Sequence, residues 1–118
     1  MAQAMGVLNA EFILSEANGS LSRDNGVLAA GNNLPAGAVL GQLENGQFTA
    51  FDPDAETGAE TAVALLIATT DATHAPAPIA VVRRLAEVVG HRLHWGAAAP
   101  EDVTAGLTSL ATSFLLAR

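Results

Sequence analysis

Hydrophobic and polar residues alternate most clearly on the two sides of the dipeptide Asn45-Gly46. Residues 38–43 before it are mostly apolar, and residues 47–51 after it carry an apolar side chain at every second position. Asparagine and glycine tolerate the positive φ that a tight turn between two strands requires. The pattern therefore predicts a β-hairpin over residues 38–51.

The other apolar segments are short and are separated by turn-forming residues. Residues 61–69 form a continuous apolar run with several β-branched side chains, which predicts a buried strand. Residues 11–14 predict a short strand, and a polar, turn-prone stretch follows. Residues 52–60 predict an acidic turn, and the two prolines within residues 74–78 predict a rigid, extended connector.

Residues 79–89 carry two conflicting signals. Val81, Val82, Leu85, Val88 and Val89 recur at the spacing of one helical face, so periodicity alone predicts a helix. The β-branched content of the segment and the prolines just before it favour a strand instead.

The C-terminal part of the chain carries the clearest helix signal. Pro100 fits the first turn of a helix, and the two acidic residues after it complement the positive end of the helix dipole. Val103, Leu107 and Leu110 follow at helical spacing, and residues 114–116 close the chain as a short strand or a helix end. Together the elements predict a mainly β fold of small strands and hairpins with one short C-terminal helix, at the border of the α+β class.

Composition predicts a single domain with a thin hydrophobic core. The chain has 118 residues, of which 50% are hydrophobic but only 4% are aromatic, and alanine supplies much of the apolar share. Alanine fills little volume, so we expect part of the protein's burial to come from other subunits.

The charge balance excludes several classes of partner. The formal net charge is −7 and the five basic residues are all arginine, which argues against nucleic-acid binding through clustered cations. The chain has no cysteine, no signal-peptide pattern at its start and no apolar run long enough to span a bilayer. We therefore expect a soluble protein made in a cytoplasm, without a nucleic-acid or membrane partner.

Two groups of residues suggest metal binding, and neither has the required spacing. An EF-hand loop beginning at Asp52 would need glycine at its sixth position and glutamate at its twelfth, where this chain has Thr57 and Val63. His91 and His94 could share one helical face, but no cysteine is present to complete a site. A solvated acidic turn and ordinary surface histidines are the simpler interpretations, so we expect no metal.

No pattern of catalytic or cofactor-binding residues is present. The sequence lacks a G-x-S-x-G elbow, and a Walker-type loop is excluded because the chain has no lysine. We therefore predict no catalytic residues, no cofactor and no small-molecule substrate.

Two further features bear on a possible contact surface. Arg83 and its neighbour Arg84 could pair with Glu87 within one segment, although exposed pairs of this kind contribute little stability. Trp95, the single tryptophan, is either a residue at the edge of the core or a subunit contact.

Seven short segments follow one another in a distinctive order along nearly the whole chain. They are EFILSE at 11–16, NGSLSRD at 18–24, LPAGAVLG at 34–41, GQFTAFDP at 46–53, GAETAVALL at 58–66, VR and AEV within 82–88, and LHW at 93–95. A closing apolar segment ends in Arg118. In this order they resemble the bacteriophage head decoration protein family, typified by head protein D of phage lambda.

The resemblance implies a β-clip-like fold, with a strand rather than a helix over residues 79–88. It also implies a non-enzymatic virion protein that binds the major capsid protein on the outer surface of an expanded capsid. Such proteins sit as homotrimers on threefold axes and resist the pressure of packaged DNA, after a stage in the host cytoplasm. The alternatives are a small β-fold ligand-binding module and a cytoplasmic oligomeric scaffold.

The resemblance further implies an N-terminal arm that engages the shell. We expect this arm in residues 1–25 and a β-rich decoration domain in residues 26–118. Polar, glycine-containing chain separates the arm's apolar cluster from the rest, so we expect few local partners for it. The residues expected to contact the capsid are Phe12, Ile13, Leu14, Ser22 and Arg23. Those expected at the subunit interface are Arg83, Glu87 and Trp95.

Overall fold

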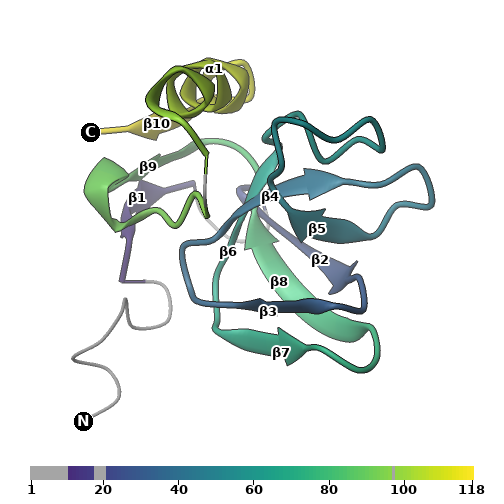
Figure 1. Ribbon diagram of the computed structural model, residues 1–118. Coiled ribbons are helices and arrows are strands. Elements are labelled where there is room, and N and C mark those ends of the chain that lie inside the picture. The colour runs from purple at the N-terminus through teal and green to yellow at the C-terminus, as the bar shows by residue number, and fades with distance from the viewer. Residues whose placement is uncertain (1–10, 18–20, 97) are drawn as a thin grey trace, which may run out of the picture.

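The structure is a computed structural model that describes residues 11–17, 21–96 and 98–118. In these residues the chain forms ten short strands, one 3-10 helix and one α-helix (Figure 1). The strands are β1 (Ile13–Glu16), β2 (Arg23–Leu28), β3 (Asn32–Leu34), β4 (Val39–Gln42), β5 (Phe48–Ala50), β6 (Ala64–Leu66), β7 (Thr70–Ala72), β8 (Ala77–Val82), β9 (Ala86–Val88) and β10 (Leu115–Ala117). The 3-10 helix η2 is Gly90–Arg92 and the α-helix α1 is Pro100–Ala111. The predicted mainly β fold with one short C-terminal helix is confirmed.

Five of the strands close into a small barrel in the order β2-β5-β4-β6-β8, beside a two-stranded sheet of β3 and β7. Strands β4 and β5 form the predicted hairpin and pair antiparallel. The backbone N–H of Gly46 donates a 2.9 Å hydrogen bond to the carbonyl of Leu43, and Gly46 has a φ of 89°. Glycine adopts this φ without steric cost, which explains the Asn-Gly pair in this turn.

The second Asn-Gly pair, Asn25-Gly26, makes no turn. It lies within β2, where Gly26 pairs with Ile79 of β8. A Cβ atom on Gly26 would lie 2.6 Å from a ring carbon of Phe48, so glycine here makes room for that ring. The remaining Asn-Gly pair, at residues 18–19, lies outside the described residues.

Strands β4 and β6 and the last residues of β8 are buried on both of their faces. Leu66 and Val81 belong to one apolar cluster inside the barrel, whereas their neighbours Leu65 and Val82 belong to a second cluster between the barrel and the rest of the molecule. Side chains alternate between the two faces of a strand, so β4, β6 and β8 each supply both clusters. Burial on both faces explains why residues 61–69 are apolar without alternation. Of that run, Ala64–Leu66 forms strand β6, and the residues on either side of it lie outside the strand.

Residues 79–89 are extended, so the helix suggested by periodicity is wrong. They form two strands, however, instead of the single strand that the resemblance implies over residues 79–88. Strand β8 pairs with β2 and β6, and β9 pairs with β1 and β10. A turn at residues 83–85 separates β8 from β9, and Leu85 has a φ of 56° in it. Apolar residues of two unrelated strands therefore happened to match a helical spacing. Strand β8 also begins at Ala77, inside the expected connector.

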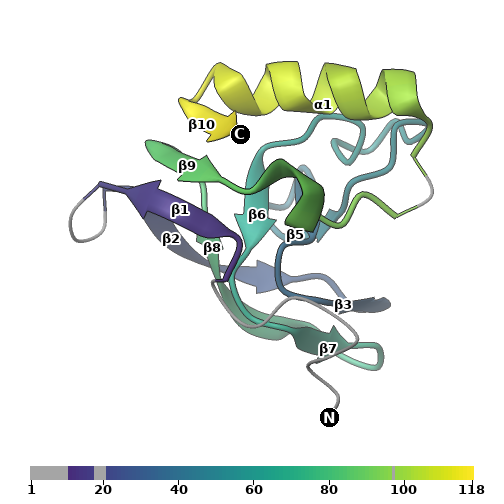
Figure 2. The same cartoon turned by 90° about the vertical axis from the view of Figure 1, so that its left-hand side faces the viewer.

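A second sheet brings the two ends of the described chain together in the order β1-β9-β10. Strand β1 is antiparallel to β9, and β10, formed by the closing apolar segment, is parallel to it. Helix α1 begins at Pro100 as predicted and lies across one side of the molecule next to β10, with Gly106 and Leu110 buried (Figure 2). No helix in the described part of the chain has the length and apolar content needed to cross a membrane.

The described N-terminal residues are integrated into the domain, unlike the separate arm expected over residues 1–25. Phe12 is fully buried in the core cluster beneath the second sheet, and β1 pairs along β9. The expected boundary after Asn25 falls inside β2, which pairs with β8 along its whole length. The partners of these strands lie far away in the sequence, which is why local reasoning found few. Residues 1–10 lie outside the described residues.

Candidate functional site

All five arginines of the chain form ion pairs with carboxylates around the second sheet. The pairs are Arg23–Glu16, Arg83–Asp24, Arg84–Asp24, Arg92–Glu11 and Arg118–Glu87. They lie on β1, β9, β10 and η2 and at the adjoining ends of β2 and β8, a region that we call the sheet end. The charged pairs thus lie in the part of the molecule where β1 and β10, near the two ends of the described chain, flank β9 (Figure 1).

The side chain of Glu16 links the end of β1 to the start of β2 through hydrogen bonds. The guanidinium of Arg23 donates to both carboxylate oxygens, with Nη2 2.6 Å from Oε1 and Nε 2.9 Å from Oε2. The fully buried Ser22 donates its hydroxyl to Oε2 at 2.7 Å. Hydrogen bonding from Arg23, with a smaller contribution from Ser22, holds the pKa of Glu16 below its ordinary value. This forked arrangement is the strong form of a charge-assisted hydrogen bond.

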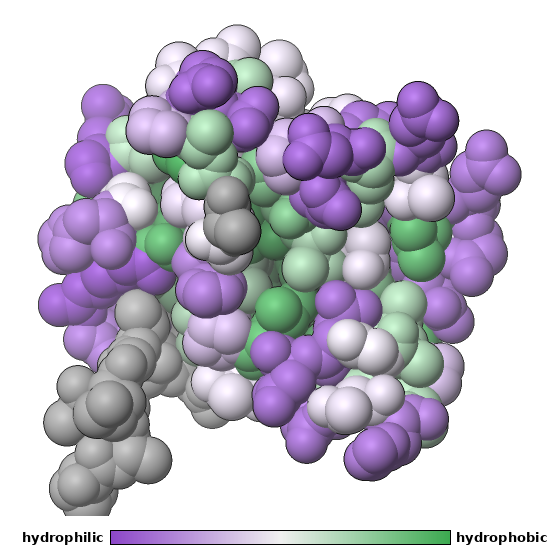
Figure 3. All heavy atoms as spheres, viewed as in Figure 1, coloured by the Kyte–Doolittle hydropathy of each residue, from purple (hydrophilic) through white to green (hydrophobic). Residues whose placement is uncertain are grey.

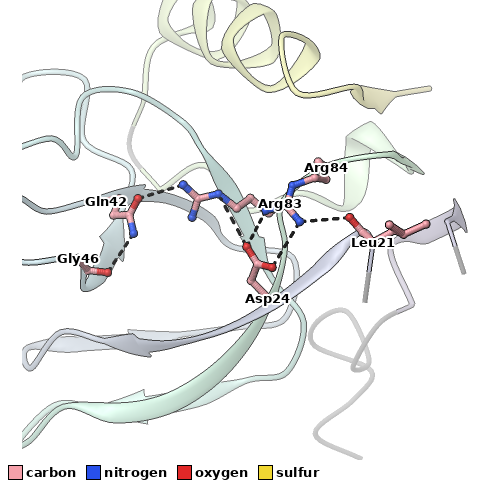
Figure 4. Close-up of polar contacts among 6 residues, drawn as sticks. All are labelled: Leu21, Asp24, Gln42, Gly46, Arg83 and Arg84. Carbon is pink, nitrogen blue, oxygen red and sulfur yellow. Dashed lines mark hydrogen bonds and ion pairs between the residues drawn. The ribbon is translucent and has the colours of Figure 1, made fainter. Parts of the chain in front are cut away.

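Asp24 of β2 binds the two arginines that follow β8 (Figure 4). The Nη2 atom of Arg84 lies 2.7 Å from Oδ2 of Asp24, and Nε of Arg83 lies 4.0 Å from the same oxygen. Arg83 also donates to Oε1 of Gln42 at 3.1 Å, and Arg84 donates to the carbonyl of Leu21 at 3.1 Å. Hydrogen bonding from Arg84 holds the pKa of Asp24 below its ordinary value.

Glu87 joins the three strands of the second sheet through its side chain. From the central strand β9 it accepts a 3.0 Å hydrogen bond from Ser15 of β1 and a 2.6 Å hydrogen bond from Nε of Arg118 beyond β10. These bonds, first that from Arg118, lower the pKa of Glu87. The predicted pairing of residues 83–84 with Glu87 is therefore wrong, because the turn between β8 and β9 directs both arginines to β2.

Trp95 packs at the edge of the core beneath α1. Its ring lies edge-to-face with Phe51, with centroids 5.5 Å apart and planes at 83°. A Cβ atom on Gly106 would lie 2.4 Å from the indole, so α1 approaches the ring closely at a residue without a side chain. The structure thus supports the core-edge interpretation of Trp95, and its role as a subunit contact remains a prediction.

The residues expected to contact a capsid are unequally accessible. Phe12 and Ser22 are fully buried, and Ile13 and Arg23 are partly buried. Leu14 is 56% exposed, at the point where a β-bulge interrupts the pairing of β1 with β9. Of the five, Leu14 has the side chain that is most available to a partner.

Eight of the twelve carboxylates form no ion pair with an arginine among the described residues. They are Glu44, Asp52, Asp54, Glu56, Glu60, Asp71, Glu101 and Asp102. Figure 3 shows hydrophilic residues over the loops on either side of β5, on the right, and also over the sheet end, on the left. The negative charge of the protein is therefore concentrated away from the sheet end.

Two of the carboxylates within residues 52–60 accept hydrogen bonds from the backbone of their own turn. Asp52 accepts the backbone N–H of Asp54 at 3.0 Å, and Glu60 accepts that of Gly58 at 2.8 Å. Acidic side chains commonly satisfy turn backbone in this way. Within the described residues, no three His, Asp or Glu side chains are grouped so that they could hold a metal ion.

The pairs at the sheet end were missed by sequence reasoning, apart from the separate mention of Arg23, Arg83 and Glu87. Arg84 lies 60 residues from Asp24, and Glu87 lies 72 residues from Ser15. No local pattern marks pairs so distant. Composition was the one available signal. The chain has five arginines and twelve acidic residues, so a carboxylate was available to pair with each arginine.

Comparison with known proteins places the chain among the structural proteins of bacteriophage heads. A family model described as bacteriophage lambda head decoration protein D matches residues 2–114. The chain belongs to this family, and the resemblance drawn from its segment order is confirmed. No individual curated protein matches the chain significantly. The protein is accordingly a capsid decoration protein, associated with the capsid in the virion.

Proposed function

We propose that this protein binds the outer surface of the expanded capsid as a homotrimer and reinforces it against the pressure of packaged DNA. Its direct partner would be the major capsid protein, and it would pass through the host cytoplasm before assembly. The single observation that carries the proposal is the family match over residues 2–114, which covers nearly the whole fold. The role is structural, and we expect no catalysis.

The alanine-rich core supports association with other copies. Many of the buried core positions are alanines, including Ala36, Ala38, Ala62 and Ala64, which bury little area per residue. A fold of this size gains stability when neighbouring subunits cover more of its apolar surface.

The expected subunit contacts remain predictions. Arg83 and Glu87 are already engaged within the chain, and Trp95 is partly buried against the core. A subunit interface at these residues would therefore use their remaining exposed edges. For the same reason a capsid contact near the N-terminus would rely on Leu14 rather than on Phe12 or Ser22.

Binding to capsids of the same phage tests the proposal. The purified protein is mixed with expanded and with unexpanded undecorated capsids, which are then sedimented. We expect saturable binding to expanded capsids in multiples of three copies per threefold position, and higher resistance of DNA-filled heads to heat. Absence of binding to expanded capsids would refute the proposal, and binding as single copies would refute the trimer.

A further inference from the structure

The two-stranded ribbon of β2 and β8 has an outer face that the described chain leaves exposed over part of its length. The two strands are antiparallel, and their register pairs Asn25 with Ala80 and Val27 with Pro78 (Figure 1). Residues directly opposite one another in such a pair point to the same face of the sheet. All four are exposed. We call these four residues the uncovered face.

The same side of the sheet is buried one step further along the ribbon. Val82 lies two residues beyond Ala80 and is fully buried in the cluster that contains Phe12. Ile67 belongs to this cluster too, and its N–H donates to the carbonyl of Ala80 at 3.2 Å. Alternate residues of a strand share a face, so the uncovered face continues the surface on which this cluster packs. Among the described residues, no second layer covers that continuation.

The distribution of charge favours this face for contact between copies of the chain. The net charge is −7, and every arginine already forms an ion pair with a carboxylate of its own chain. Contact through charged surfaces would bring like charges together or replace pairs that exist already. The four residues of the uncovered face carry no charge, and charged residues are depleted at the centre of protein interfaces.

The side chains on this face are also suited to burial. Val27 is 38% exposed, and it is the large exposed apolar residue that lies outside the sheet end in the described part of the chain. The other five lie at the sheet end, where a second copy would have to cover arginines and carboxylates as well. Ala80 and Pro78 lose almost no side-chain entropy when they are buried, which lowers the cost of ordering an interface.

We propose that the uncovered face lies on the threefold axis of the trimer, where it contacts the same face of the two other copies. This inference rests on the homotrimer of the proposed function and gives its interface a location. Contacts around a ring ordinarily join two different surfaces of the chain, but a surface on the axis itself meets its own equivalents. The location differs from the interface predicted at Arg83, Glu87 and Trp95, whose side chains are engaged within the chain.

The variants Val27→Glu and Ala80→Glu test this location by bringing three like charges together on the axis. The protein concentration at which half of the copies are assembled should rise by about tenfold or more, as on loss of an interface anchor. Light scattering over a dilution series gives this concentration, and circular dichroism checks that each variant is folded. Ala105→Glu is the matched control, because it adds the same charge at an exposed alanine of α1. It should assemble as the wild type does.

A cross-linking experiment keeps the test decisive if a glutamate variant fails to fold. The chain has no cysteine, so Val27→Cys provides a single thiol on the uncovered face. A short bismaleimide should join two copies within one trimer through this thiol, giving a covalent dimer on a denaturing gel. The matched variant Ala105→Cys should remain unlinked at the same protein concentration.

The remaining outcomes each overturn the inference. A wild-type trimer, with unchanged assembly of both glutamate variants and no cross-linking of Val27→Cys, would do so and leave the proposed function intact. Unchanged trimer mass with weaker sedimentation on expanded capsids would assign the face to the shell. A melting temperature lowered in the full-length variants, but not in the same variants of a chain beginning at Glu11, would assign it to residues 1–10. A wild-type protein that is monomeric both in solution and on capsids would refute the proposed trimer itself.

Discussion

The carboxylates of Glu16, Asp24 and Glu87 make the stability of the sheet end dependent on pH. Each has a pKa below its ordinary value because an arginine stabilises its charged form. A lowered pKa in the folded state contributes stability that is complete above the ordinary pKa and is lost as pH falls through the folded value. We therefore expect the melting temperature to fall as pH drops below about 4.5.

The variant Glu16→Gln tests this account at one residue. It cannot form the ion pair with Arg23, so its melting temperature near neutral pH should be lower than that of the wild type. Its further loss on acidification should be smaller, because one of the titrating groups is gone. Thermal unfolding followed between about pH 3 and 7 provides the comparison. Parallel pH profiles for the two proteins would show that Glu16 contributes nothing to acid sensitivity.

Residue roles were predictable from the sequence where a single turn decides them. Gly46 and Pro100 act within a few residues of themselves, so the hairpin turn and the helix start follow from local chemistry. Gly26 shows the limit, since its reason is the ring of Phe48 on another strand. The partners of Glu16, Ser22 and Arg23, were close in sequence but were not identified, because the stretch after residue 14 was expected to be polar, turn-prone chain.

At the scale of elements, α1 depends on the close fit between Gly106 and Trp95. Gly106→Ala would favour the helix by about 1 kcal/mol if nothing opposed the added methyl group. Here the new Cβ would lie 2.4 Å from the indole, so we expect a net loss of roughly 1–3 kcal/mol. Chemical denaturation gives the free energy of unfolding.

Trp95→Leu is the matched background for that substitution. The smaller side chain should itself destabilise the protein, but Gly106→Ala added to it should be neutral or stabilising, because the clash is absent. The double-mutant cycle then gives a favourable coupling between the two substitutions. Simple additivity would show that the indole does not limit the approach of α1.

The N-terminal strand is a second element whose role can be tested directly. A chain beginning at Gly26 would lack Phe12, β1 and half of β2, and we expect it to lose cooperative thermal unfolding. A chain beginning at Glu11 keeps every described strand and should unfold cooperatively, as measured by circular dichroism. Cooperative unfolding of the shorter chain would restore the separate arm predicted from the sequence.

Elements with a local signal were predicted and those defined by distant pairing were not. The hairpin of β4 and β5 and the helix α1 have turn and capping residues of their own. The second sheet joins β1, β9 and β10 from both ends of the chain, so no window of sequence contains it. The helical spacing in residues 79–89 was misleading for the same reason, since two sheets account for it.

The whole molecule is asymmetric in charge and in exposed apolar area. The sheet end holds all five arginines with four carboxylates and most of the large exposed apolar side chains, whereas eight carboxylates lie elsewhere. The family was identifiable from the segment order, but the asymmetry required the three-dimensional structure.

The central claim is that this protein decorates the outside of an expanded phage capsid, and a density map of the capsid tests it most directly. Expanded capsids imaged by electron cryomicroscopy with and without the purified protein should differ by density on the outer surface at threefold positions. We predict that three copies of the structure fit this density at each threefold position. No added density, or density on the inner surface, would contradict it.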